Sequence, residues 1–166
     1  MSSYKSISRQ DDLFGDIGQV REVAVTLSKD RVTQTVKAPR LQVTCPEDVA
    51  GIFHPYFEDL ATEHFMVVVL NTANVVTDYA VASQGGLAAS IVEPRAIFQA
   101  ALLCNAAAII VLHNHPSGNP EPSREDIKVT RQLVEAGRLL GIPVRDHIIM
   151  TPDGGHTSLA ERNLLQ

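Results

Sequence analysis

The 166-residue chain contains no tryptophan, and only 5% of its residues are aromatic. Proteins that bind single-stranded nucleic acid commonly stack the bases on aromatic side chains, so a stacking groove of that kind is not expected. No apolar run is long enough to cross a bilayer, and residues 1–16 lack the apolar centre of a signal peptide. We therefore expect a cytoplasmic protein that has no membrane partner.

Cysteine is also scarce, since the chain contains only Cys45 and Cys104. The two residues lie far apart and do not form a Cys-x-x-Cys pair. We therefore expect two reduced thiols, as in a cytoplasmic protein, rather than a structural disulfide. A zinc deaminase requires a Pro-Cys-x-x-Cys ligand pair, so the sequence excludes that class of enzyme.

The net charge of −5 is unevenly distributed. Residues 1–40 contain seven Lys and Arg against five Asp and Glu, whereas residues 41–166 contain seven against fourteen. An acidic domain is repelled by a phosphate backbone, so nucleic acid is a possible partner that the charge does not support. Only the N-terminal arm has a positive balance that would attract it.

Three segments differ in their pattern along the chain. Residues 1–20 are polar and have no periodicity, which predicts a flexible tail. Residues 21–40 form an N-terminal extension, and apolar and polar residues alternate from 22 to 43, which predicts a pair of strands. Residues 41–166 form the main domain. A strand pair in the extension would be able to extend a sheet across two copies of the chain, so a homodimer is a candidate assembly.

The main domain mixes helix and strand patterns. A helix pattern covers 44–60, with Thr44 and Glu47 at the spacing of a capping box and Pro55 as the point where the helix is expected to kink or restart. Segment 107–150 has the pattern of strand, loop, helix and strand, like a βαβ crossover. The other expected elements are a hairpin of strands at 64–70 and 75–82, a helix at 94–105 and a short helix near the C-terminus. This order predicts an α/β fold in which helices flank a mixed β-sheet on both sides.

Residues 111–127, "VLHNHPSGNPEPSREDI", carry the most informative pattern in the chain. Side chains two positions apart in a strand point the same way, so His113 and His115 are directed to one point at the strand end. Asp126 lies in the first turn of the next helix, and the proline-rich loop 116–122 can fold that turn back over the strand. Two histidines and a carboxylate, with a fourth position left for water, are the ligands of a hydrolytic zinc site.

Each half of this pattern also has an explanation without a metal. Ser123 and Asp126 have the spacing of a capping box, which would account for both residues. Two histidines at the end of an apolar strand can likewise be satisfied by hydrogen bonds. Neither explanation accounts for all of these side chains lying around one loop, so we favour metal binding.

The spacing of these residues resembles a known motif. Two histidines separated by one residue, then seven residues, a serine, two residues and an aspartate resemble the JAMM motif of MPN-domain zinc metalloproteases. The longer string "HNHPSGNPEPSREDI", with "EHFMVVVLNT" upstream and "VRDHIIM" downstream, is similar to the bacterial RadC-like branch of that family. The resemblance covers residues 41–166 and implies an MPN fold, which is cytidine-deaminase-like.

The resemblance also implies a set of functional residues. One Zn²⁺ ion per chain would be held by His113, His115 and Asp126. Ser123 would help to hold a polarised carbonyl or a tetrahedral intermediate. Glu63, just before the first strand of the hairpin, would act as general base for the zinc-bound water.

Other ionisable residues are expected to have more ordinary roles. Glu58 lies within a helix pattern and Glu93 lies at a helix start, so both are weaker candidates for the base. Asp146 and His147 are expected to form a buried structural pair, with support of the metal ligands as the less favoured alternative. The remaining histidines lack ligand spacing and are expected to be ordinary: His54, His64 and His156.

Together these residues predict a zinc hydrolase that cleaves a peptide or isopeptide bond in a peptide or protein substrate. The rival hypothesis is a DNA-associated or scaffold module of the RadC-like type whose zinc site is structural or vestigial. Full-length RadC members carry an N-terminal helix-hairpin-helix region, whereas residues 1–40 are too short and too strand-like for one. A helix-borne zincin site is excluded because His-Glu-x-x-His is absent. The letters HNH at 113–115 do not form the longer ββα-metal element of the nucleases with that name.

Overall fold

The structure is a computed structural model that describes residues 41–85 and 92–166. The predicted tail and most of the predicted strand pair lie outside these residues. The described part contains three helices and five strands, in the following order along the chain: α2 (Pro46–Phe57), β1 (His64–Leu70), β2 (Val76–Gln84), α3 (Pro94–Leu103), β3 (Ala108–Asn114), α4 (Arg124–Leu140), β4 (Val144–Met150) and β5 (His156–Ser158).

The five strands form one mixed sheet in the order β2-β1-β3-β4-β5. Strand β1 pairs antiparallel with β2 and with β3, so the predicted hairpin is confirmed. Strand β3 pairs in parallel with β4, and α4 connects them as the predicted βαβ crossover. Strand β5 adds a short antiparallel edge to β4.

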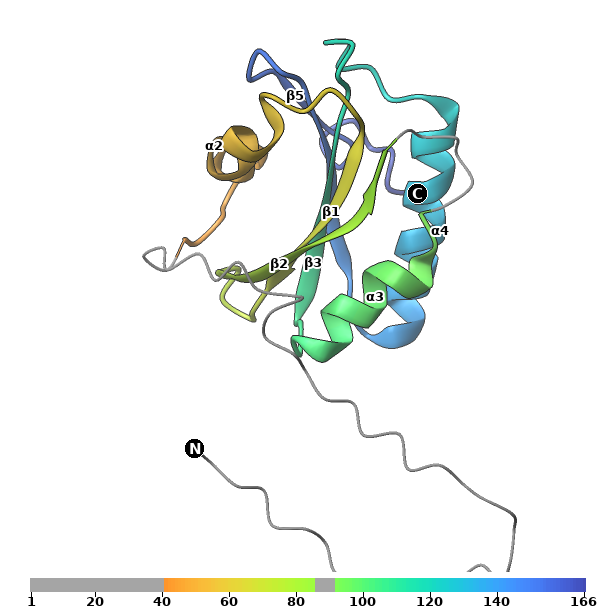
Figure 1. Ribbon diagram of the computed structural model, residues 1–166. Coiled ribbons are helices and arrows are strands. Elements are labelled where there is room, and N and C mark those ends of the chain that lie inside the picture. The colour runs from red at the N-terminus through yellow and green to blue at the C-terminus, as the bar shows by residue number, and fades with distance from the viewer. Residues whose placement is uncertain (1–40, 86–91) are drawn as a thin grey trace, which may run out of the picture.

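Helices cover both faces of the sheet, as the sequence predicts. Figure 1 shows α2 on one face and α3 with α4 on the other. Alternate strand residues such as Met66 and Leu112 belong to the core against α2. The residues between them, such as Val67 and Val111, belong to the core against α3 and α4. The strands are therefore apolar on both faces because each face is buried.

Helix α2 differs from the prediction at its start and at Pro55. Its N-cap is Cys45, one residue later than Thr44, and the carboxylate that reaches back belongs to Asp48. Asp48 Oδ2 accepts hydrogen bonds from the Thr44 N–H (2.8 Å) and hydroxyl (2.9 Å). The helix does not restart at Pro55, because Phe53 and Phe57 on either side of it are both anchored in the core.

The C-terminal segment also differs from the prediction, since β5 and a series of turns stand where a short helix was expected. The buried carboxylate of Asp146 holds this segment. It accepts hydrogen bonds from the Ser158 hydroxyl (2.6 Å) and from the Ala160 N–H (2.9 Å). Helix α4 ends at Gly141, which has a positive φ of 70° that favours glycine. Within the described residues, no helix combines the length and the apolar character that crossing a membrane would require.

Candidate metal centre

The carboxyl end of β3 and the start of α4 meet at one edge of the sheet. His113 lies near the end of β3, and His115 follows the strand directly, with its N–H bonded to the Met150 carbonyl (2.8 Å). The chain then turns at Gly118, whose φ is 77° and whose N–H bonds back to the His115 carbonyl (3.0 Å). Such a φ favours glycine, so the turn back toward α4 is built into the sequence.

This turn brings together the three side chains that the sequence predicts as metal ligands. His113 Nε2 lies 2.9 Å from His115 Nε2 and 3.3 Å from Asp126 Oδ1, and His115 Nε2 lies 3.5 Å from Asp126 Oδ2. The side chains of His113 and Asp126 are 1% and 4% exposed, whereas that of His115 is 11% exposed. A buried cluster of two imidazole nitrogens and a carboxylate is positioned to hold a metal ion.

The capping box at the start of α4 is present together with this cluster. The Ser123 N–H donates to Asp126 Oδ2 (2.7 Å), and the Ser123 hydroxyl oxygen accepts from the Asp126 N–H (3.1 Å). The box holds the Asp126 carboxylate turned back toward the end of β3, where the histidines lie. Capping and metal binding are therefore compatible roles for one carboxylate rather than alternatives.

The charges in the cluster favour a bound cation. Burial would raise the pKa of Asp126, but its hydrogen bonds with His113 and His115 outweigh that effect and hold the pKa well below its usual range. The hydrogen bond with Asp126 in turn raises the pKa of His115, although burial opposes it. Without a metal, a proton on His115 balances the buried carboxylate, and a divalent ion would take its place.

The loop after β3 selects the ring nitrogen with which His115 faces the cluster. His115 Nδ1 lies 2.7 Å from the Asn119 carbonyl oxygen. A carbonyl oxygen only accepts, so Nδ1 carries the hydrogen. The neutral ring then presents the lone pair of Nε2 to the cluster, which is the form that binds a metal.

Glu63, the predicted general base, lies directly before β1 and lines the same site. Phe65 pairs with His113 across the antiparallel strands, and the same register continued by two residues places Glu63 opposite His115. Glu63 lines a cleft of about 650 Å³ together with His115, Ser123 and Asp126. Its charge also contributes to raising the pKa of His115.

The two weaker candidates for the base lie elsewhere. Glu58 follows the last residue of α2 and pairs with His54 at 3.6 Å. Glu93 is the N-cap of α3 and pairs with Arg95 at 3.3 Å. Neither lines the cleft beside the histidines.

Asn114, between the two histidines, is a residue of the site that the sequence argument missed. It is 1% exposed and points to the opposite face of β3. Its Oδ1 accepts from the His64 N–H (2.7 Å), and its amide nitrogen donates to the Thr62 carbonyl (3.0 Å). Asn114 therefore clamps the residues on both sides of Glu63 to the strand that carries the histidines. The alternation of side chains along β3 indicated its direction but not its partners.

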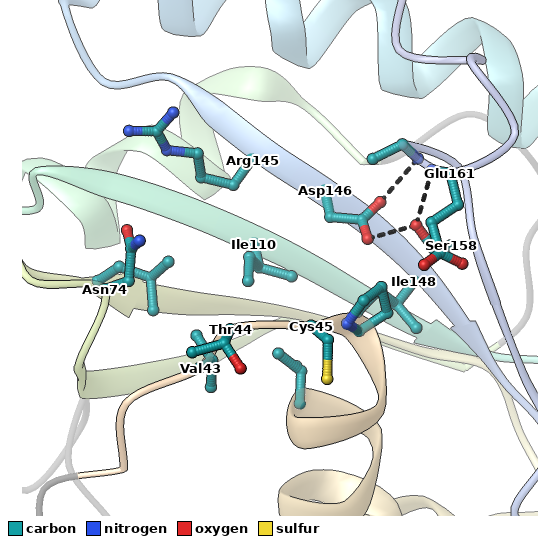
Figure 2. A pocket seen from close by; sticks show the side chains of 14 residues that line it. Val43, Thr44, Cys45, Asn74, Ile110, Arg145, Asp146, Ile148, Ser158 and Glu161 are labelled. Carbon is teal, nitrogen blue, oxygen red and sulfur yellow. Dashed lines mark hydrogen bonds between the residues drawn. The ribbon is translucent and has the colours of Figure 1, made fainter.

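Asp146 and His147 are both buried, as expected, but their side chains do not pair with each other. Figure 2 shows Asp146 bonded to Ser158 on the α2 side of the sheet. Burial raises the pKa of Asp146, and its hydrogen bonds oppose that effect. His147 points to the other face, where its Nε2 lies 2.8 Å from Nδ1 of His113. The expected structural role thus fits Asp146, whereas His147 contacts a candidate ligand.

A second hollow lies on the α2 side of the sheet and is drawn in Figure 2. It has a volume of about 360 Å³, and its lining includes Cys45, Arg145 and Ile148. In the part of the chain that the structure describes, the one cluster of potential metal ligands is that of His113, and it lies outside this hollow. Cys45 and Cys104 are both free thiols.

The remaining histidines make separate contacts, in keeping with ordinary roles. His54 Nε2 lies 3.1 Å from the Pro152 carbonyl. His64 Nδ1 lies 3.0 Å from the Tyr56 hydroxyl. His156 lies 3.8 Å from the Glu47 carboxylate.

The fold and the site define an α/β domain with a candidate metal centre of two histidines and an aspartate. The family of RadC-like JAB domains matches residues 43–164, and the chain belongs to that family. Its place in the RadC-like branch agrees with the motif that the sequence carries.

Several relatives share much of the sequence. A UPF0758 protein of Salinibacter ruber is 59% identical over 134 residues, which are 80% of this chain and 57% of that protein. A UPF0758 protein of Methanosarcina acetivorans is 40% identical over 167 residues, which cover 99% of this chain and 72% of that protein. A third UPF0758 protein, from Caldanaerobacter subterraneus, is 45% identical over 141 residues, which are 60% of that protein. The chain thus spans 57% to 72% of the length of these three relatives.

Proposed function

We propose that this protein is a zinc-dependent hydrolase that cleaves a peptide or isopeptide bond in a peptide or protein substrate. One observation carries the proposal. The buried cluster of His113, His115 and Asp126 opens into a cleft that Glu63 and Ser123 also line. This arrangement combines a metal site with an acid–base group and a hydrogen-bond donor, which are the groups that hydrolysis of an amide requires.

The residues of the chain would divide the reaction between them. A zinc ion held by the three ligands would act as a Lewis acid and lower the pKa of a water molecule toward about 7. Glu63 would take the proton from the attacking water and deliver it to the leaving amine. The Ser123 hydroxyl already accepts the Asp126 N–H, so its own hydrogen can be donated to the carbonyl oxygen of the substrate.

The test combines metal analysis with a broad set of substrates. The protein should bind one Zn²⁺ ion per chain and hydrolyse a member of a library of peptide and isopeptide bonds. Glu63→Gln should lower kcat about 10²- to 10⁴-fold, because the general base is lost, and should leave the zinc content unchanged. Glu58→Gln is the matched control, since Glu58 lies at the end of α2 outside the cleft, and it should keep full activity.

Two results would overturn the proposal. The first is stoichiometric zinc with no hydrolysis of any member of the library. The second is a Glu63→Gln variant that is as active as the wild type. The first result would favour the rival module with a structural or vestigial zinc site, and DNA binding that is lost when residues 1–40 are removed would support that rival.

A further inference from the structure

His147 is a fully buried residue that the proposed reaction does not use. It lies on β4 at 0% exposure, opposite Val111 in the parallel pairing of β3 and β4. Both of its ring nitrogens have partners. Nε2 lies 2.8 Å from Nδ1 of His113, and Nδ1 lies 2.6 Å from the hydroxyl oxygen of Thr130, which is also 0% exposed.

These hydrogen bonds form a row that ends at the backbone carbonyl of Asp126, and that carbonyl determines the direction of each bond. The Thr130 hydroxyl lies 2.6 Å from the backbone carbonyl of Asp126, which can only accept, so Thr130 donates its one hydrogen there. The reverse direction would leave two oxygen lone pairs facing each other at that distance. Thr130 must then accept from His147, which places a hydrogen on Nδ1 of His147.

The remaining bond fixes the hydrogen of His113. The His147 ring is fully buried and neither of its hydrogen-bond partners, Thr130 and His113, is a carboxylate, so the ring is neutral. Its Nε2 therefore has no hydrogen and accepts from Nδ1 of His113. With the hydrogen on Nδ1, the lone pair of His113 is on Nε2, the atom that faces His115 and Asp126.

We propose that His147 is a positioning residue for the metal, because it holds His113 in the tautomer whose Nε2 lone pair faces the site. The inference rests on the metal-binding part of the proposed function. The two candidate histidine ligands thus share one tautomer, with the hydrogen on Nδ1, but different partners hold it. The loop carbonyl of Asn119 selects it for His115, and the buried chain through His147 and Thr130 selects it for His113.

The first test compares two variants of nearly equal size. His147→Gln keeps an oxygen that can accept from His113 Nδ1, whereas His147→Met removes the acceptor and fills the same space. Competition for Zn²⁺ with a chromophoric chelator should show a 10- to 100-fold loss of affinity for His147→Met, the usual cost of losing a residue that orients a ligand. His147→Gln should stay within about fivefold of the wild type, since it restores that contact. Equal zinc affinities for the two variants would overturn the inference.

The second test starts from the wild-type protein and needs no metal. Nitrogen-15 NMR of the imidazole rings in the metal-free wild type, at alkaline pH, reports which ring nitrogen carries the hydrogen. His113 and His147 should each show a protonated Nδ1 and an unprotonated Nε2. Thr130→Val, which is close in shape and removes the hydroxyl, should convert His147 and His113 to a mixture of tautomers.

A wild-type spectrum with the hydrogen on Nε2 of His113 would show that the inference is wrong. These measurements also separate the inference from the proposed reaction. A protein that binds zinc with the expected difference between the two His147 variants, and hydrolyses nothing, would contradict only the hydrolase proposal.

Discussion

Neighbouring residues on β3 and β4 point to opposite faces of the sheet and meet different surroundings. On the face of α3 and α4, His113 and His147 contact each other through their rings, and their hydrogen bonds continue to the candidate metal centre. On the face of α2, Asn114 and Asp146 bond to the backbone of neighbouring segments. Polar groups are buried on both faces, but among the described residues the cluster of three possible metal ligands lies on the face of α3 and α4.

The difference shows that two residues adjacent in one strand can have different roles, because they lie on opposite faces of the sheet. Side chains alternate along a strand, so His113 and Asn114, or Asp146 and His147, are adjacent in sequence and separated by the sheet. The α2 face uses its polar groups to hold the loop before β1 and the C-terminal segment in place. The face of α3 and α4, called the metal face below, is thus positioned to hold a metal ion, and the α2 face holds the segments around it.

The largest expected effect comes from exchanging one carboxylate for an amide on each face. Asp126→Asn should weaken Zn²⁺ binding by more than about 100-fold, because loss of a ligand exceeds the 10- to 100-fold cost of losing a residue behind a ligand. Asp146→Asn should keep its zinc affinity and lower the free energy of unfolding by about 1–3 kcal/mol, because the amide nitrogen cannot accept a hydrogen bond that a carboxylate oxygen of Asp146 accepts. Chelator competition and urea unfolding measure the two quantities. The comparison between the faces fails if Asp146→Asn loses zinc as severely as Asp126→Asn.

A smaller effect is expected for the clamp on Glu63. Asn114→Ala removes both hydrogen bonds to the residues around Glu63, and a displaced base should lower kcat about 10- to 100-fold while zinc affinity stays near that of the wild type. Steady-state kinetics on a library member that the protein hydrolyses, together with chelator competition, would check this.

A matched control for this variant lies in the turn between β1 and β2. There Asn71 Oδ1 accepts from the Ala73 N–H (2.9 Å) and the Val75 N–H (3.1 Å), so Asn71→Ala also removes two bonds between a side chain and the backbone. This variant should retain the wild-type kcat. An equal loss of kcat in both asparagine variants would point to general destabilisation instead of a clamp.

The smallest expected effect is the pH dependence of stability that the cluster of His115 and Asp126 should produce. The raised pKa of His115 stabilises the metal-free protein fully below about pH 6.5, and this stabilisation is lost as the pH rises through the folded-state pKa. The lowered pKa of Asp126 stabilises the protein above about pH 4, and that stabilisation is lost as the pH falls. The contribution of the cluster should therefore be greatest between about pH 4 and 6.5.

Urea unfolding across this pH range measures the effect. Zinc binds deprotonated imidazoles, so the difference in stability between zinc-loaded and metal-free protein should widen as the pH rises. Asp126→Asn should flatten the alkaline loss in the metal-free protein, and Asp146→Asn should retain it. A flat wild-type profile across neutral pH would contradict the ion-pair description of the cluster.

Much of the metal face could be predicted, because its residues are related by short distances along the sequence. His113 and His115 share a direction through the alternation of a strand, and Ser123 and Asp126 are joined by the first turn of a helix. The residue classes and their spacing were enough to propose a metal site, and the structure brings the same three ligands together. The hairpin, the crossover and the mixed sheet with helices on both sides likewise followed from periodicity over short segments.

What the sequence could not supply was the pairing of distant segments. The antiparallel pairing of β1 with β3 brings Glu63 to the cleft that His115 lines and lets Asn114 hold both neighbours of Glu63. The parallel pairing of β3 with β4 brings His147 against His113, and it separates His147 from Asp146. Local patterns determine which way a side chain points from its own strand. Its partner depends on which strand lies alongside and in which register, and the chain reaches that arrangement only by burying both faces of the sheet together.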